Sequence, residues 1–142
     1  MPACESTVTV SAPRERVWHI LSDVIAWPGW LPTVTKVEAL DGQAVVPGAR
    51  FVVHQPRLRP ATWTVSEVAA PERFVWVARS PGLRMVADHV VSEDSPGRST
   101  VVLQFSFEGL LGGVAGRLFR SVAADYLAQE AAALKREAES QG

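Results

Sequence analysis

The chain has 142 residues, of which 47% are hydrophobic and 20% charged, a composition that favours one folded domain over residues 1–142 and argues against intrinsic disorder. Fourteen Lys and Arg residues nearly balance fifteen Asp and Glu residues, and no basic run could neutralise a row of phosphates, so we expect no nucleic-acid partner. The single cysteine, Cys4, excludes an internal disulfide and a multi-cysteine metal cluster.

The N-terminal segment has neither the basic start nor the unbroken apolar stretch of a signal peptide. No window approaches the ~20 apolar residues that span a bilayer. We therefore expect a cytoplasmic protein that does not act at a membrane.

The first elements are a strand and two short helices. Residues 7–11 alternate between polar and apolar side chains, which predicts a strand with one buried face. Ser11 is expected to cap a helix whose first turn contains Pro13 and Glu15. A second, shorter helix is expected over residues 24–30.

The middle of the chain reads as a series of short strands separated by Pro-Gly, Asp-Gly or Pro-containing turns. Hairpin spacing between them predicts an antiparallel meander. The expected strands cover residues 34–40, 51–53, 62–68, 73–79, 83–91 and 100–107.

After a glycine-rich stretch at residues 109–116, apolar side chains recur every three or four residues as far as Ala138. This pattern predicts one long helix of about six turns. Because no strand–helix–strand alternation occurs, the fold class is α+β, with a curved antiparallel sheet of about seven strands around the final helix. A sheet that curls around a single helix leaves space near its open end, so we expect a pocket there.

Several of these segments, in this order, resemble a known superfamily. They are the Ser-Ala-Pro at residues 11–13, the Trp-Pro-Gly-Trp-Leu-Pro at 27–32, the Gly-Ala-Arg-Phe at 48–51 and the final strand at 100–109. The chain resembles the polyketide cyclase/dehydratase-like branch of the START/Bet v 1 superfamily, also called SRPBCC domains. The resemblance implies a helix-grip fold with a hydrophobic cavity between sheet and long helix. Members include cyclases as well as hormone and lipid binders, so the ligand stays open.

His89 is the candidate catalytic residue. On the strand at residues 83–91 it shares the more apolar face with Met85 and Ala87, where an imidazole could transfer protons to or from a ligand. The alternative is a hydrogen-bonded structural histidine.

The same alternation predicts a mostly aromatic and aliphatic ligand wall, typical of small-molecule sites. The alternative is that these side chains pack solidly. With an anchoring or gating tryptophan from the second helix, the candidate ligand-binding residues are Trp30, Phe51, Val53, Gln55, Trp63, Val65, Phe74, Trp76, Met85, Ala87, His89, Leu103, Phe105, Leu118, Val122 and Tyr126.

No cofactor and no metal are expected. The glycines at 109–116 precede a helix but no further strand follows, so they do not form a dinucleotide-binding loop. The three histidines are not at metal-ligand spacing, and Cys4 has no positioned base nearby.

Three functions remain open. The favoured one is a carrier or sensor that binds a small hydrophobic metabolite. The alternative is a polyketide cyclase or dehydratase that uses His89 with Tyr126 or Gln55. The third is a protein-binding domain that acts through its outer surface, and a homodimer is also left open.

Overall fold

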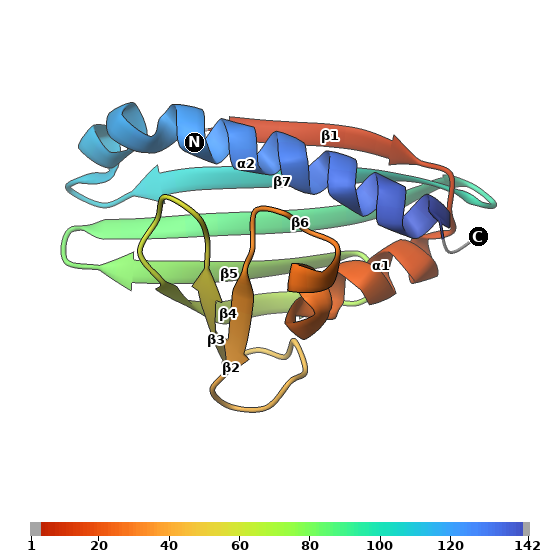
Figure 1. The fold of residues 1–142 in the computed structure, drawn as a ribbon, viewed down its shortest axis with the longest axis horizontal. Helices are drawn as coiled ribbons and strands as arrows, with labels where there is room; N and C mark the ends of the chain where they lie inside the picture. Colours follow the sequence, from red (N-terminus) through yellow and green to blue (C-terminus); the bar gives the residue numbers. More distant parts are fainter. Residues whose placement is uncertain (1–3, 141–142) are drawn as a thin grey trace.

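The computed structural model describes residues 4–140 and shows one seven-stranded antiparallel sheet (Figure 1). Neighbouring strands follow the order β1-β7-β6-β5-β4-β3-β2, so every neighbour except β1–β7 is a sequential hairpin partner. The strands are β1 (Cys4–Val10), β2 (Lys36–Ala39), β3 (Arg50–His54), β4 (Ala61–Ala69), β5 (Arg73–Ser80), β6 (Leu83–Ser95) and β7 (Arg98–Glu108).

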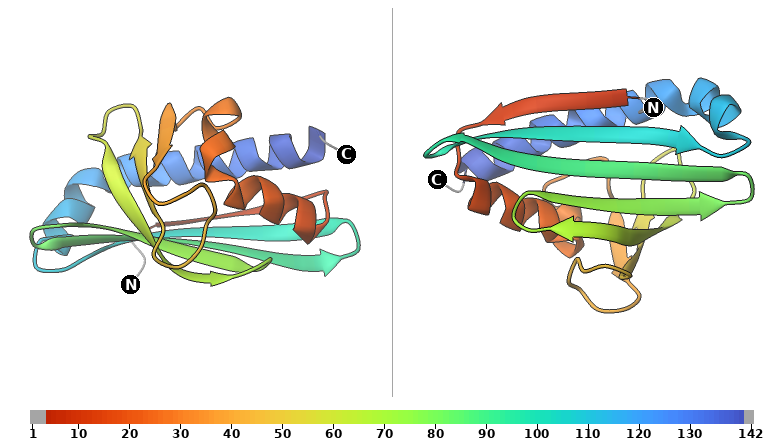
Figure 2. Two further views of the ribbon diagram at one scale, coloured as in Figure 1. Left: turned by 90° about the horizontal axis from the view of Figure 1, so that it is seen from below. Right: turned by 180° about the vertical axis from the view of Figure 1, so that it is seen from behind.

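The three helical segments lie on one face of this sheet (Figure 2). They are α1 (Arg14–Ser22), a short 3-10 helix η1 (Val24–Gly29) and the long α2 (Gly112–Ser140). The sheet curves around α2, which confirms the predicted fold class and element order. Within residues 4–140, no helix combines the length and the apolar character needed to cross a bilayer.

The predicted cap at Ser11 is wrong. Helix α1 begins at Arg14, its N-cap position is Pro13, and no side chain caps it. Ser11 instead donates its backbone N–H to the Glu139 carboxylate at 2.8 Å. The segment before α1 is thereby tied to the end of α2.

Helix α2 is longer than predicted because the glycines at its start are helical. It has 29 residues, about eight turns. A Cβ atom added to Gly112 would lie 2.9 Å from the Phe107 carbonyl oxygen, and one on Gly116 would lie 3.5 Å from the Phe107 ring. Small residues therefore let the first turns of α2 approach the end of β7 closely.

Gly109 makes the turn between β7 and α2. Its φ of +95° favours glycine, and a Cβ atom there would lie 2.7 Å from the Gly82 carbonyl oxygen. The same oxygen accepts a hydrogen bond of 2.7 Å from the Leu111 N–H. The β7–α2 turn thus rests on the β5–β6 turn and fixes where α2 begins.

The core is packed toward the C-terminal end of α2. Leu134 and Ala138 are fully buried there together with Leu21 of α1 and Phe74 of β5. Near the other end of the helix, Leu118 is 69% exposed. Solid packing at one end and an uncovered helix at the other leave a hollow under residues 119–130 of α2.

Candidate ligand-binding site

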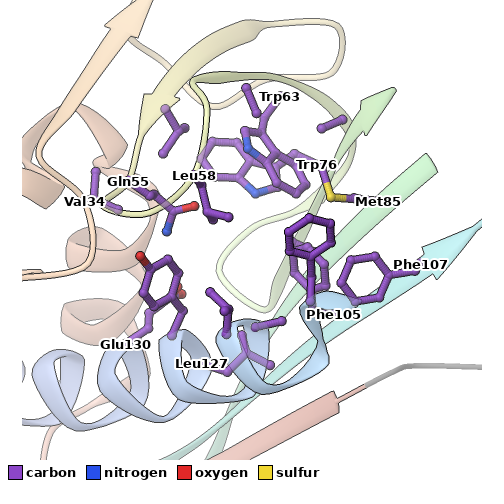
Figure 3. A pocket seen from close by; sticks show the side chains of 18 of the residues that line it. Val34, Gln55, Leu58, Trp63, Trp76, Met85, Phe105, Phe107, Leu127 and Glu130 are labelled. Atoms are coloured by element: carbon purple, nitrogen blue, oxygen red, sulfur yellow. The ribbon is translucent and has the colours of Figure 1, made fainter. Parts of the chain in front are cut away.

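A cavity of about 680 Å³ lies between the concave face of the sheet and α2 (Figure 3). This volume is within the range of small-molecule sites, about 300–1,000 Å³. The predicted hollow between sheet and helix is therefore present.

Alternate residues of five strands form one wall of this cavity, because successive side chains of a strand point to opposite faces. The strand side chains are Val53, Trp63, Trp76, Ala78, Leu83, Met85, Ala87, His89, Leu103, Phe105 and Phe107. The helix side chains face them from α2 and are Phe119, Val122, Ala123, Tyr126, Leu127 and Glu130.

Trp76 is the centre of an aromatic cluster beside the cavity. Its ring centroid lies 5.3 Å from that of Trp27 and 5.7 Å from that of Trp63. Phe74 contacts it edge-on at 5.5 Å. Each such pair contributes about 0.5–1.5 kcal/mol beyond its buried area, so this wall is held rigid before any ligand arrives.

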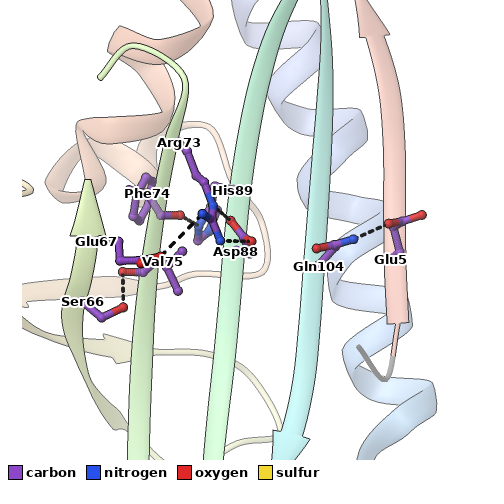
Figure 4. Close-up of polar contacts among 9 residues, drawn as sticks. All are labelled: Glu5, Ser66, Glu67, Arg73, Phe74, Val75, Asp88, His89 and Gln104. Carbon is purple, nitrogen blue, oxygen red and sulfur yellow. Dashed lines mark hydrogen bonds and ion pairs between the residues drawn. The ribbon is translucent and has the colours of Figure 1, made fainter. Parts of the chain in front are cut away.

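His89 is buried in this wall and its tautomer is fixed. Its ring stacks on Phe74 with centroids 4.1 Å apart, and Nδ1 lies 3.1 Å from the Phe74 carbonyl oxygen (Figure 4). A carbonyl oxygen can only accept, so Nδ1 carries the proton and Nε2 presents a bare lone pair. Burial lowers the pKa of His89 to about 4, which keeps the imidazole neutral at pH 7.

The neighbouring residue confirms the predicted alternation along β6. The Asp88 carboxylate pairs with the guanidinium of Arg73 at 2.9 and 3.0 Å (Figure 4). This exposed pair lies on the outer face of the sheet, whereas His89 is on the inner face. The charge next to the histidine is thus neutralised outside the cavity.

Glu130 is the second titratable group of the cavity. Its Oε2 atom lies 3.8 Å from His89 Nε2 and is buried without a hydrogen-bond partner in the described part of the chain. Burial raises the pKa of Glu130 to about 7. At pH 7 the His89 imidazole is neutral and the Glu130 carboxyl group is about half protonated. The two groups therefore do not form an ion pair, and both can bind a polar atom of a ligand.

The β3–β4 loop is fastened to α2 at the cavity. The Tyr126 hydroxyl donates a hydrogen bond to the Pro56 carbonyl oxygen. The Arg57 guanidinium lies 5.4 Å from the centroid of the Tyr126 ring and 3.3 Å from Asp125. The hydroxyl of Tyr126 is therefore engaged with the loop rather than with the His89–Glu130 pair.

The amino-acid sequence matches one family model over residues 1–139, and its description is polyketide cyclase/dehydrase and lipid transport. The chain belongs to this family. No curated protein sequence matches the chain.

Solved structures of several proteins are similar to this polyketide cyclase/dehydrase family member. The Zhui aromatase/cyclase from Streptomyces sp. R1128 superposes with a TM-score of 0.79 at 23% identity, over 97% of this chain and 93% of that chain. A START superfamily protein from Mycobacterium smegmatis gives a TM-score of 0.76 at 18% identity, over 98% of both chains. At these identities the likeness concerns the fold.

Most of the predicted ligand-binding residues of this family member line the cavity. They are Val53, Gln55, Trp63, Trp76, Met85, Ala87, His89, Leu103, Phe105, Val122 and Tyr126. Whether they contact a ligand stays a prediction.

Five predicted wall residues lie outside the cavity lining, which corrects the prediction. Phe51 and Phe74 are covered by Trp76, whose centroid lies 6.1 and 5.5 Å from theirs. Val65, the cross-strand neighbour of Trp76, is equally buried. Trp30 packs beside Trp27 with centroids 6.3 Å apart, and Leu118 points to solvent.

The sequence-based prediction missed Glu130, Trp27 and Phe119, which line the cavity. A signal for Glu130 existed, because residues 119, 122, 126 and 130 follow at helical spacing and place a carboxylate on an otherwise apolar face. Within residues 4–140, no three His, Cys, Asp or Glu side chains are arranged to hold a metal ion.

Proposed function

We propose that the protein binds a small hydrophobic molecule, aromatic or lipid-like, in the cavity between the sheet and α2. The observation that carries the proposal is the cavity of about 680 Å³ with apolar walls. We expect binding because the apolar surface of the ligand leaves water for a preformed site, which is favourable by about 25 cal/mol per Å² buried.

The two polar groups add a requirement on the ligand. Nε2 of His89 accepts a hydrogen bond, and the Glu130 carboxyl group donates one while it is neutral. They lie 3.8 Å apart, so one hydroxyl oxygen of a ligand can contact both, and a keto oxygen can accept from Glu130. We infer that the ligand is apolar over most of its surface and carries an oxygen at this end.

A fluorescence titration with 1-aminoanthracene, a neutral aromatic probe, tests the proposal. Ala87 lines the cavity and lies opposite Trp76 and Phe105 on the neighbouring strands. Replacing it, Ala87→Phe, fills part of the cavity and is expected to weaken probe binding roughly tenfold or more.

The matched control is Ala128→Phe, because Ala128 is exposed on α2. Saturable binding by the wild type and by the control, with weakened binding by Ala87→Phe, supports the proposal. Equal affinities of all three proteins would overturn it, since the probe would then bind elsewhere.

A second candidate function is a dehydration, favoured by the approach of His89 to Glu130. In a β-hydroxy ketone, His89 Nε2 would take a proton from the carbon next to the carbonyl, and a C=C bond would form as the C–O bond breaks. Glu130 would protonate the departing hydroxyl group, which leaves as water. The proton on His89 then returns to the Glu130 carboxylate across 3.8 Å.

Enone absorbance from 4-hydroxy-4-phenylbutan-2-one tests this alternative. A dehydratase should lose on the order of 10²–10⁴-fold in rate in the Glu130→Gln variant, with folding checked by circular dichroism. Absence of turnover in a wild type that binds 1-aminoanthracene would reject catalysis and keep binding. The low pKa of His89 makes it a weak base, and for this reason we place binding first.

A further inference from the structure

Exposed apolar side chains are concentrated at the start of α2. Among residues 4–140, five of the seven exposed large hydrophobic side chains fall between residues 110 and 119. We call these five the mouth patch: Leu110 is 96% exposed, Leu118 69%, Val114 58%, Leu111 51% and Phe119 44%. Single exposed apolar residues are ordinary, but a cluster of this kind marks an interaction site.

The mouth patch borders the entrance of the cavity. Phe119 belongs to the patch and also lines the cavity. Leu111 packs against Gly82 in the β5–β6 turn, next to the cavity residue Leu83. In Figure 1 the start of α2, the β7–α2 turn and the β5–β6 turn meet at the left end of the molecule. The patch therefore adjoins the end of the cavity that Leu83 and Phe119 line, where Phe119 is partly exposed.

The same end of the protein is strongly basic. Segments 55–60, 79–84 and 108–125 contain six arginines and two acidic residues, an excess of four positive charges, although the whole chain has a net charge of −1. Both acidic residues already form ion pairs: Asp125 lies 3.3 Å from Arg57, and Glu108 lies 2.6 Å from Arg84. The other four of these six arginines, Arg59, Arg79, Arg117 and Arg120, have no ion-pair partner within residues 4–140.

Positive charge at the mouth and net negative charge elsewhere orient the protein toward an anionic surface. A second copy of the chain would bring two sets of unpaired arginines together, so the charge disfavours a dimer through this patch. Leu110 is almost fully exposed on the β7–α2 turn, and Leu118 is exposed on the adjoining helix. Exposed leucines at an end of the protein that is rich in arginine match the chemistry of a bilayer interface.

We propose that the mouth patch docks on an anionic lipid bilayer. Leu110, Leu111, Val114 and Leu118 enter the boundary between headgroups and acyl chains, and the arginines contact lipid phosphates. The cavity then opens directly onto the bilayer, so that an apolar ligand crosses between the two without passing through water. This peripheral contact departs from the sequence-based expectation that no membrane takes part.

Vesicle co-sedimentation tests this inference. We expect binding to vesicles of phosphatidylcholine mixed with phosphatidylserine, weak binding to phosphatidylcholine alone, and release by added salt. The double variants Leu110→Ser/Leu118→Ser and Arg117→Ser/Arg120→Ser should each lower the partition coefficient roughly tenfold or more.

Two matched controls lie away from the mouth. Leu40→Ser/Val46→Ser removes the other two exposed apolar side chains, which lie in the β2–β3 loop. Arg98→Ser/Arg136→Ser removes two exposed arginines, at the start of β7 and in the last turns of α2. Both controls should sediment with anionic vesicles as the wild type does.

Three results would overturn the inference. They are no binding to anionic vesicles, equal losses in the mouth and control variants, and a dimer in sedimentation velocity that Leu110→Ser/Leu118→Ser dissociates. Binding of 1-aminoanthracene separates this inference from the proposed function, because neither Leu110 nor Leu118 lines the cavity. A wild type that binds anionic vesicles but not the probe keeps the docking surface and rejects the cavity ligand.

Discussion

His89 and Glu130 face each other across the cavity with Nε2 and Oε2 3.8 Å apart, one from β6 and the other from α2. Glu130 lies eleven residues beyond Phe119, about 16 Å farther along the helix, so the pair sits well inside the entrance. Burial shifts the two groups in opposite directions, with the pKa of His89 lowered to about 4 and that of Glu130 raised to about 7. Both shifts favour the neutral forms.

These shifts predict how stability depends on pH. Glu130 destabilises the native state as pH rises from about 4.5 to about 7, because the unfolded carboxyl group ionises first. His89 destabilises it as pH falls from about 6.5 to about 4. Between about pH 4.5 and 6.5 the two effects nearly cancel.

Replacing Glu130→Gln should therefore stabilise the protein at high pH. We expect the free energy of unfolding to rise by about 3 kcal/mol near pH 8 and to change little near pH 4. At pH 8 the Glu130 carboxyl group ionises more readily in the unfolded chain than in its buried site, whereas an amide does not ionise in either state. Urea unfolding at the two pH values measures this. The exposed Glu93→Gln serves as control, and equal destabilisation of the Glu130 variant at both pH values would refute the raised pKa.

Ligand preference should follow the protonation of Glu130. 9-Fluorenone differs from fluorene by one carbonyl oxygen, which a neutral Glu130 can contact as donor. We expect fluorenone to bind roughly fivefold more tightly than fluorene at about pH 5 and to lose this preference above about pH 8. Calorimetric titrations of the wild type and of Glu130→Met measure it, and a preference that persists in the variant would assign the carbonyl contact to another group.

The turn at Gly109 should tolerate no side chain. Its positive φ and the 2.7 Å approach to the Gly82 oxygen predict that Gly109→Ala lowers the free energy of unfolding by about 1–3 kcal/mol. Gly113 is helical with open space around it, so Gly113→Ala should instead raise stability by about 0.5–1 kcal/mol. Urea denaturation compares the two, and similar effects of both substitutions would contradict the described packing.

Tyr126→Phe should loosen the β3–β4 loop. It removes the hydrogen bond to the Pro56 carbonyl oxygen, at a cost of about 1 kcal/mol. Hydrogen exchange at the Leu58 amide, which donates to Gln55 within the loop, should become faster. Ser66→Ala removes the side-chain hydrogen bond from Ser66 of β4 to the Val75 carbonyl oxygen of β5 and should leave exchange at Leu58 unchanged. Unchanged exchange in the Tyr126 variant would mean that the loop keeps its conformation without the contact to α2.

Strand alternation was the most informative part of the sequence. On β6 it placed His89, Ala87 and Met85 on the inner face and Asp88 on the outer face, as the structure shows. A period of two leaves little freedom once one face is recognised as apolar. The order of elements followed equally from turn residues and hairpin spacing.

The helix was less predictable. Residues 118 and 119 are both apolar, but about 100° of rotation separates them, and the helix presents Phe119 to the cavity while Leu118 is exposed. Helical spacing from Phe119 and Tyr126 places Glu130 on the cavity face, but the burial of its carboxylate depends on the curved sheet closing over it, which the helical pattern alone does not encode. Likewise, the helical start of α2 depends on contacts of Gly112 and Gly116 with Phe107.

Intermolecular NOEs between 1-aminoanthracene and methyl groups test the account most directly, because both the cavity and the mouth patch are apolar. We predict NOEs from the probe rings to the methyl groups of Met85 and Leu103, which line the cavity. NOEs confined to the exposed Leu110 and Leu118 would contradict a ligand site between the sheet and α2.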